Sequence, residues 1–278
     1  MKKNVTNALL KLAPIVLAVA GTTFNCLGTT VYWNGNVSQA WTDPNNFQAS
    51  GSNLPGVPQA GDTVYMESWA AQTPLLNGSG YASINDIYIS KGMTIAGGGV
   101  LNTTFFKLGW DATGTLNVTG GSLTAGNHLD VGGYSGGTAT MNVSGGSITV
   151  GGLYFDLNNV ATGASYLNLT GGTLTDNGVL SINSTHPSVL NINGGTLVVP
   201  NSQLGNVNYW IGSGNITGPG GGGASTLIID TVSDQGFLVI TAAPEPATDS
   251  LLVAGVVGFL AFGFIRRRSK DRPDTCQP

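Results

Sequence analysis

A short motif of one apolar residue, asparagine, one apolar residue, one polar residue and two glycines recurs four times in the chain. The copies are GTLNVTGGSLTAG from Gly114, TATMNVSGGSITVG from Thr138, SYLNLTGGTLTDNG from Ser165 and SVLNINGGTLVVP from Ser188. The first glycines of the four pairs are Gly120, Gly145, Gly171 and Gly194, so successive copies are 25, 26 and 23 residues apart. Weaker copies place Gly97 before this series and Gly218 after it. A fixed period of this length indicates an architecture of stacked units.

The motif alternates apolar and polar residues, which predicts half-buried strands. The glycine pair permits a positive φ, so it suits a sharp corner between two strands. A second apolar-polar-apolar stretch follows most copies: FKL at 106–108, LDV at 129–131, FDL at 155–157 and LSI at 180–182. No unit can bury its apolar face alone, whereas stacked units can. The sequence therefore predicts an all-β fold, a right-handed parallel β-helix or β-solenoid with about 23–26 residues per coil.

The alignment of the copies predicts which residues stack on one another. Two interior ladders are expected: Leu116, Met141, Leu167 and Leu190, and Val118, Val143, Leu169 and Ile192. Asn117, Asn142, Asn168 and Asn191 are expected to stack on the opposite face of the same sheet. The shorter stretches predict an outward, solvent-exposed column of Lys107, Asp130, Asp156 and Ser181. Lys107, Asp130 and Asp156 form the candidate outer-face site, because two neighbouring carboxylates repel unless a cation or ligand lies between them.

The charge of the body limits its partners. Residues 21–243 contain ten acidic residues and two lysines, a net charge of −8, and no arginine. Nucleic acid and anionic lipid are bound through Lys and Arg, so we expect no nucleic-acid partner. The chain has two cysteines, Cys26 and Cys276, which give no zinc framework. We expect no cofactor and no metal.

The N-terminus has the pattern of a secretory signal peptide. Lys2 and Lys3 precede an apolar run from Leu12 to Ala20, and Ala18-Val19-Ala20 provides small residues for cleavage. Residues 1–20 are therefore predicted to be a signal helix, and a buried core helix is the alternative.

The C-terminus combines a short motif, an apolar run and arginines. Pro244-Glu245-Pro246 cannot lie inside a helix and marks a junction. Residues 247–265 would span about 28 Å as a helix, enough to cross a bilayer core. Arg266, Arg267 and Arg268 would stay on the cytoplasmic side, which leaves the body outside. We expect residues 243–278 to be a separate unit, with a transmembrane segment at 247–265 and a basic tail at 266–278.

These three C-terminal parts together resemble the PEP-CTERM sorting signal of Gram-negative bacteria. The resemblance implies cleavage by exosortase, a membrane protease, and an association with extracellular polysaccharide. It implies an inner-membrane precursor that is later released to the cell surface or the extracellular matrix. The family usually ends within a few residues of the arginines, whereas SKDRPDTCQP follows them here. An ordinary single-span anchor is the alternative.

The region before the repeats resembles the first segment of exported bacterial β-strand-repeat proteins, including autotransporter-like passenger domains. The resemblance rests on VYWNGNVSQAWTDPNNF from Val31 and GVPQAGDTVYM from Gly56. We expect residues 21–66 to cap the solenoid and residues 67–242 to form it, with STLIID and GFLVITA as C-terminal cap strands. Bulky aromatic residues at a cap block end-to-end pairing. A sugar-binding role for Trp33 and Trp41 is the alternative.

Two classes of function fit this sequence. The first is a non-catalytic surface or matrix protein. The second is a β-helix polysaccharide lyase or glycoside hydrolase, because such folds also host enzymes. The body contains no arginine for a lyase and no evident acid with a raised pKa for a glycosidase. His128 and His186 occupy different positions in their units and are expected to be surface residues. The sequence favours the non-catalytic protein.

Overall fold

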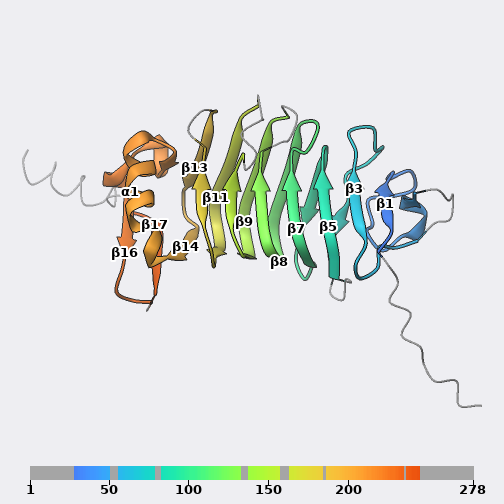
Figure 1. The fold of residues 1–278 in the computed structure, drawn as a ribbon, viewed down its shortest axis with the longest axis horizontal. Coiled ribbons are helices and arrows are strands. Elements are labelled where there is room, and N and C mark those ends of the chain that lie inside the picture. The colour runs from blue at the N-terminus through green and yellow to red at the C-terminus, as the bar shows by residue number, and fades with distance from the viewer. Residues whose placement is uncertain are drawn as a thin grey trace, which may run out of the picture.

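The computed structural model describes residues 28–50, 56–78, 83–132, 137–156, 163–183, 186–234 and 236–244. These residues form a β-solenoid of about six turns, as the sequence predicts. Figure 1 shows the strands standing side by side along the long axis of the molecule, with β1 at one end and α1, β16 and β17 at the other.

The strands are short except where one strand bends round a corner and continues on the next face. They are β1 (Thr30–Trp33), β2 (Phe47–Ala49), β3 (Thr63–Met66), β4 (Leu75–Leu76), β5 (Ser83–Ile89), β6 (Gly92–Ile95), β7 (Val100–Leu108), β8 (Gly114–Val131), β9 (Ala139–Val150), β10 (Leu153–Phe155), β11 (Ser165–Asp176), β12 (Leu180–Ile182), β13 (Ser188–Ile192), β14 (Thr196–Pro200), β15 (Ile216–Thr217), β16 (Leu227–Asp230) and β17 (Phe237–Ala242). The helices are α1 (Leu204–Ser213) and the 3-10 turns Pro44–Asn46, Asn201–Gln203, Pro219–Gly221 and Ala224–Thr226.

Parallel pairing divides these strands among three faces. Face A contains β4, β6, the first parts of β8, β9 and β11, then β13 and β15. Face B contains the first parts of β5 and β7, the middle of β8, the second parts of β9 and β11, and β14. Face C contains β1, β3, the second parts of β5 and β7, the end of β8, β10 and β12.

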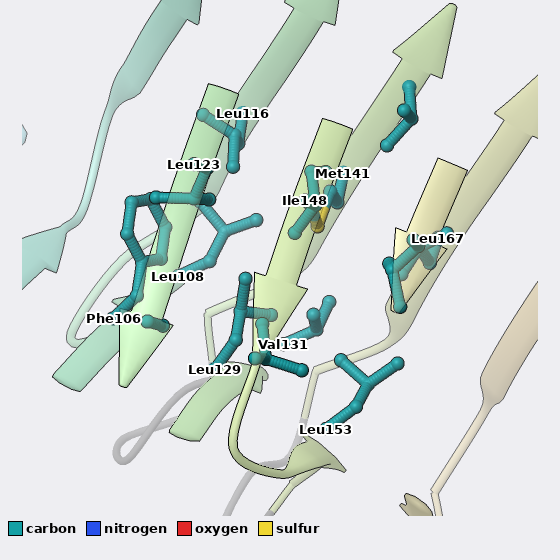
Figure 2. Packing of buried hydrophobic residues seen from close by; sticks show 14 of the residues in the cluster. Phe106, Leu108, Leu116, Leu123, Leu129, Val131, Met141, Ile148, Leu153 and Leu167 are labelled. Atoms are coloured by element: carbon teal, nitrogen blue, oxygen red, sulfur yellow. The ribbon is translucent and has the colours of Figure 1, made fainter. Parts of the chain in front are cut away.

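The register on face A confirms the predicted ladders. Leu116 pairs with Met141, Met141 with Leu167, and Leu167 with Leu190. The valine ladder and the asparagine ladder run in the same register beside it. The apolar residues are fully buried, so each coil contributes the same positions to one continuous core. In Figure 2, side chains from all three faces, such as Leu116, Leu123 and Leu129, meet in this core.

The asparagines of face A also bond to one another from coil to coil. The Asn142 Nδ2 donates to Asn117 Oδ1 at 3.0 Å, and the Asn168 Nδ2 donates to Asn142 Oδ1 at 2.9 Å. An amide carries both a donor and an acceptor, so each asparagine can bond to its neighbours on both sides.

The glycine pairs form the corner between faces A and B. Gly121, Gly146 and Gly172 have φ values of 73°, 79° and 69°, a conformation that residues with a Cβ rarely adopt. Their backbones also touch: a Cβ at Gly146 would lie 2.5 Å from the carbonyl oxygen of Gly121, and one at Gly172 would lie 2.6 Å from that of Gly146. The corner therefore needs glycine both for its backbone angle and for the close approach of successive coils.

The N-terminal cap is an aromatic cluster. Trp33 and Trp41 are buried and stack at 6.2 Å between ring centroids, and Phe47 packs edge-on against both at 5.0 and 5.1 Å. Trp33 donates its indole N–H to the carbonyl oxygen of Gln72 at 2.7 Å. This burial supports the capping interpretation of both tryptophans and leaves neither ring open to a sugar. β1 and β3 lie in the segment that was predicted to be a cap. They nevertheless pair in parallel, β1 with β3 and β3 with β5, as the strands of the later coils do.

The C-terminal cap ends the parallel stack with antiparallel strands. β17 pairs antiparallel with β14, and β16 pairs antiparallel with β17, in agreement with the predicted cap strands. The helix α1 was not predicted. It buries Val207, Trp210 and Ile211, which recur at helical spacing, and Gly214 ends it in a left-handed conformation.

In the part of the chain that the structure describes, no helix is long and apolar enough to cross a membrane. Residues 1–20 and 247–265, where the sequence predicts a signal helix and a transmembrane helix, lie outside the described residues.

Replacing Val143 with Asp should destabilise the solenoid by roughly 3 kcal/mol or more, because the carboxylate would lie in a dry core. Val143 is fully buried between Val118 and Leu169. Thermal unfolding followed by circular dichroism measures the effect. Ser144→Asp, at the exposed neighbouring position, is the control and should unfold close to the wild type. Equal melting temperatures for the two variants would contradict the interior ladder.

Replacing Gly146 with Ala should cost more than about 1–2 kcal/mol, the cost of a left-handed conformation for an alanine, because the methyl group would also press on the Gly121 carbonyl. Gly97→Ala is the control, since a Cβ at Gly97 meets nothing within 4 Å. Urea unfolding of both variants compares the two costs. Similar midpoints would show that the corner tolerates a side chain.

Candidate functional site

An outward column runs along the whole of face C. The register aligns one residue from each coil: Tyr32, Tyr65, Tyr88, Lys107, Asp130, Tyr154 and Ser181. We call this set the face C column. The residues on either side of each member point into the core, because side chains alternate along a strand. It is therefore a line of aromatic, charged and hydroxyl groups on a rigid surface.

The first part of the face C column is a stack of aromatic rings. Tyr32 and Tyr65 stack at 5.5 Å between centroids, and Tyr65 and Tyr88 stack at 4.6 Å with an interplanar angle of 6°. Trp110 then meets Tyr88 edge-on at 4.7 Å. Because Tyr65 lies between two other rings, both of its faces are covered. Tyr32 is at the end of this stack, so among these rings only Tyr65 covers it, and on one face.

Lys107 lies between aromatic rings contributed by the chain itself. Its ammonium nitrogen is 4.8 Å from the Tyr88 ring centroid and 4.9 Å from the Trp110 ring centroid, and it lies 3.5 Å from the Tyr88 hydroxyl. Cation–π contacts of this kind stabilise a lysine at a partly buried position. Lys107 therefore helps to hold the aromatic rings together.

The predicted position of Asp156 is wrong. Lys107 is aligned with Asp130 as expected, but the partner of Asp130 in the next coil is Tyr154. The stretch LYF at 153–155, and not FDL at 155–157, continues the column. A shift of two residues keeps the inward and outward alternation, so the pattern alone could not separate the two alignments. Asp130 is also buried, at 3% exposed, and so does not belong to a solvent-exposed pair.

Asp156 instead occupies the corner that follows β10. It has a φ of 56°, in the left-handed region. Its buried carboxylate Oδ2 lies 2.9 Å from Nδ1 of His186 and accepts from Asn183 Nδ2 at 3.2 Å. His186 and Asn183 belong to the following coil, so Asp156 links two coils at this corner. His186 was predicted to be a surface residue; its side chain is 25% exposed and contacts the buried carboxylate of Asp156.

Burial and charge shift several pKa values on face C. The pKa of Tyr88 is raised to about 12, first by burial and then by the negative charge of Asp86. Burial also raises the pKa of Asp86, although Lys107 and a hydrogen bond from Tyr88 oppose the shift. The pKa of His128 is lowered, first by burial and then by the positive charge of Lys107. The charge of Lys107 thus acts on the pKa values of both Asp86 and His128.

A second row of aromatic rings meets the face C column at Tyr154. Phe105 meets His128 edge-on at 4.8 Å, and His128 meets Tyr154 edge-on at 5.5 Å. The Nε2 atom of His128 is buried without a hydrogen-bond partner among the described residues. Protonation would place a charge on this ring where no acceptor receives it.

A shallow pocket of about 220 Å³ lies beside the first member of the column. It is lined by Tyr32, Gln48, Ala49, Ser50 and Trp69. Trp69 is 60% exposed, whereas Trp33, Trp41 and Trp210 are buried. The sequence analysis did not single out Trp69. The available signal was a bulky aromatic residue within a polar turn, ESWAAQ, directly after a predicted strand.

The remaining predicted residues give no further site. Pro244 is exposed at the end of the last described segment, while Glu245, Pro246, Arg266, Arg267 and Arg268 lie outside the described residues. Among the residues that the structure describes, no group of three or more His, Cys, Asp or Glu side chains could hold a metal ion.

Comparison with known proteins adds no relative. No family model, no curated protein and no solved structure matches the chain.

The partly buried ring of His128, with its buried Nε2 atom, predicts a pH dependence. Because its pKa is lower in the folded state than in the unfolded state, the unfolded chain binds more protons below pH 6.5, and stability should fall as the pH is lowered through this range. His128→Phe should remove this contribution. Phenylalanine is the residue at the aligned position of the preceding coil, Phe105, and keeps the ring contacts.

Chemical unfolding of both proteins between pH 7 and pH 5 measures the difference. As the pH is lowered, the free energy of unfolding should fall faster for the wild type than for the variant. The difference should be less than about 1.4 kcal/mol per pH unit, because the unfolded wild type binds at most one extra proton and solvent screens part of the effect. The two proteins differ only at residue 128, so the comparison isolates the contribution of His128. Parallel stability curves would contradict the assignment.

Proposed function

We propose that this chain is an exported, non-catalytic surface or extracellular-matrix protein that associates with extracellular polysaccharide. In this proposal a signal helix at residues 1–20 directs export, and the helix at 247–265 anchors the precursor in the inner membrane. An exosortase-type protease then cuts near Pro244-Glu245-Pro246. The right-handed winding of the coils is also part of the proposal.

The observation that carries the proposal is the chemistry of the outer surface. Face A presents asparagine and threonine ladders, and face B presents serine and threonine ladders: Ser122, Ser147, Thr173 and Thr196, and Thr124, Thr149 and Thr175. Amide and hydroxyl groups both donate and accept hydrogen bonds. A surface of such groups can exchange hydrogen bonds between water and the hydroxyl groups of a hydrated polysaccharide.

The polysaccharide-cleaving enzyme stays the second candidate, and one observation bears on it. The carboxyl groups of Glu67 and Asp111 interact directly: the pKa of Glu67 is raised by burial first, and then by the charge and hydrogen bond of Asp111. A glycosidase needs its two carboxyl groups roughly 5–9.5 Å apart, with the scissile bond between them. Assays of the purified protein on pectate and alginate test for cleavage.

The sorting step predicts a defined mature protein. Mass spectrometry of the protein isolated from its native cells should find an N-terminus near residue 21 and a C-terminus near residue 246. The mature protein should fractionate with the cell surface or matrix. A variant in which Pro244, Glu245 and Pro246 are all alanine should keep its tail and stay in the inner membrane. A wild-type chain that still ends at Pro278 in the inner membrane would leave only a membrane anchor.

A further inference from the structure

We propose that the pocket between Tyr32 and Trp69 binds a single uncharged hexopyranose unit of a polysaccharide. This inference rests on the proposed function and adds to it a site and a ligand class. The pocket lining contains two aromatic rings, one amide, two hydroxyl groups (those of Tyr32 and Ser50) and no charged side chain. A pyranose ring matches that set, because one of its faces is made of C–H groups and its rim carries hydroxyl groups.

Hydrogen bonds hold the backbone of the turn that carries Trp69. The Ala70 amide donates to the Glu67 carbonyl oxygen at 3.1 Å, and the Ala71 amide donates to the Asn34 carbonyl oxygen at 2.8 Å. The ammonium group of Lys91 also donates to the carbonyl oxygens of Ala70 and Ala71. The backbone on the C-terminal side of the indole is therefore fixed, although the indole is exposed. With its backbone fixed, Trp69 has only two side-chain dihedral angles left to order when a ligand stacks on the ring, which keeps the entropic cost of binding small.

The opposite wall of the pocket is equally well ordered. Tyr32 stacks on Tyr65 through one face, and its cross-strand partner in β2 is Gln48. Ser50 continues from β2, and its amide donates to the Thr30 carbonyl oxygen at 2.8 Å. The ring and the polar groups thus come from two paired strands, which fixes their spacing. This places apolar contact and hydrogen-bonding groups around one small space.

The size of the pocket selects its occupant. Pockets that enclose a drug-sized ligand measure roughly 300–1,000 Å³, so 220 Å³ suits one ring rather than a long segment. A proline-rich peptide also packs on aromatic side chains, but it binds along an extended groove. The absence of charge in the lining favours a neutral sugar over a uronic acid.

The pocket is at the N-terminal end of the solenoid. It lies beside β1, at the end of the solenoid opposite β16 and β17, from which the chain continues to its C-terminal tail (Figure 1). In the proposed membrane-bound precursor, the pocket would therefore be at the opposite end of the described body from Pro244, after which the tail begins.

Electrophoresis of the full-length protein through native gels tests the inference, with dextran, galactomannan or alginate cast into each gel. The wild type should be retarded by dextran or galactomannan. Trp69→Ala should lower the affinity for that polymer, obtained from the retardation, by about tenfold, which is the loss expected for one stacking contact. Tyr209→Ala removes an aromatic ring of similar exposure, 62%, on α1 and is the matched control. It should bind as the wild type does.

A second measurement reports on Trp69 directly. The neutral polymer that retards the protein should protect part of the tryptophan fluorescence from quenching by acrylamide in the wild type. It should give no protection in Trp69→Ala. Circular dichroism melting of Trp69→Ala should match the wild type, since its side chain is outside the core.

Several results would overturn the inference: equal retardation of Trp69→Ala and wild type, retardation by alginate alone, no retardation by any of the three polymers, or displacement of the polymer by a proline-rich peptide. The proposed function fails separately. If the purified protein binds a neutral polymer through Trp69 but the protein in cells is neither exported nor found in the surface fraction, then the pocket stands and the cellular role does not.

Discussion

Backbone contact between successive coils at the glycine corner is the constraint on which the rest of this structure depends. At Gly121, Gly146 and Gly172 the chain turns in a left-handed conformation, directly against the backbone of the coil before it. Any side chain there would push the coils apart. Because the coils meet at this corner, the residues that follow it fall into register on face B, and those that precede it fall into register on face A.

The interior and the exterior use this register in different ways. Inside, identical positions stack as apolar ladders whose burial supplies the main stabilising free energy. Outside, the asparagine amides bond along the axis, so that each new coil satisfies polar groups of the previous one. On face C the same principle aligns aromatic rings and Lys107. The regular spacing of the backbone thus turns a one-dimensional repeat into lines of like chemistry on the surface.

The structure could be predicted from the sequence where a glycine pair fixes the alignment of the copies. Faces A and B could be predicted because a glycine pair fixes the alignment of each copy, and Leu116 through Leu190 stack as expected. Face C has no such anchor. Its strands alternate with period two, so Tyr154 and Asp156 were equally compatible with the column, and only long-range pairing selects Tyr154.

Two other features depended on information that lies outside the repeat. The helix α1 interrupts a β pattern, and the apolar spacing of Val207, Trp210 and Ile211 is too brief to stand out beside it. The pocket at Trp69 is formed by β1, β2 and a turn after β3, which are three separate segments of the sequence. A site of this kind arises from the juxtaposition of strands, whereas a motif search reads one segment at a time.

The antiparallel strand β17 at the C-terminal end has a consequence for the length of the molecule. A parallel coil can be added only to an edge whose strand runs in the same direction, and on face B β17 lies over the last such edge with the opposite direction. Another copy of the chain therefore cannot extend the parallel stack of that face. With about six turns at about 4.8 Å each, the stack is roughly 29 Å long, and the number of repeats in the sequence sets this length. Duplication or loss of a whole unit would change that length by one coil at a time and leave both caps intact.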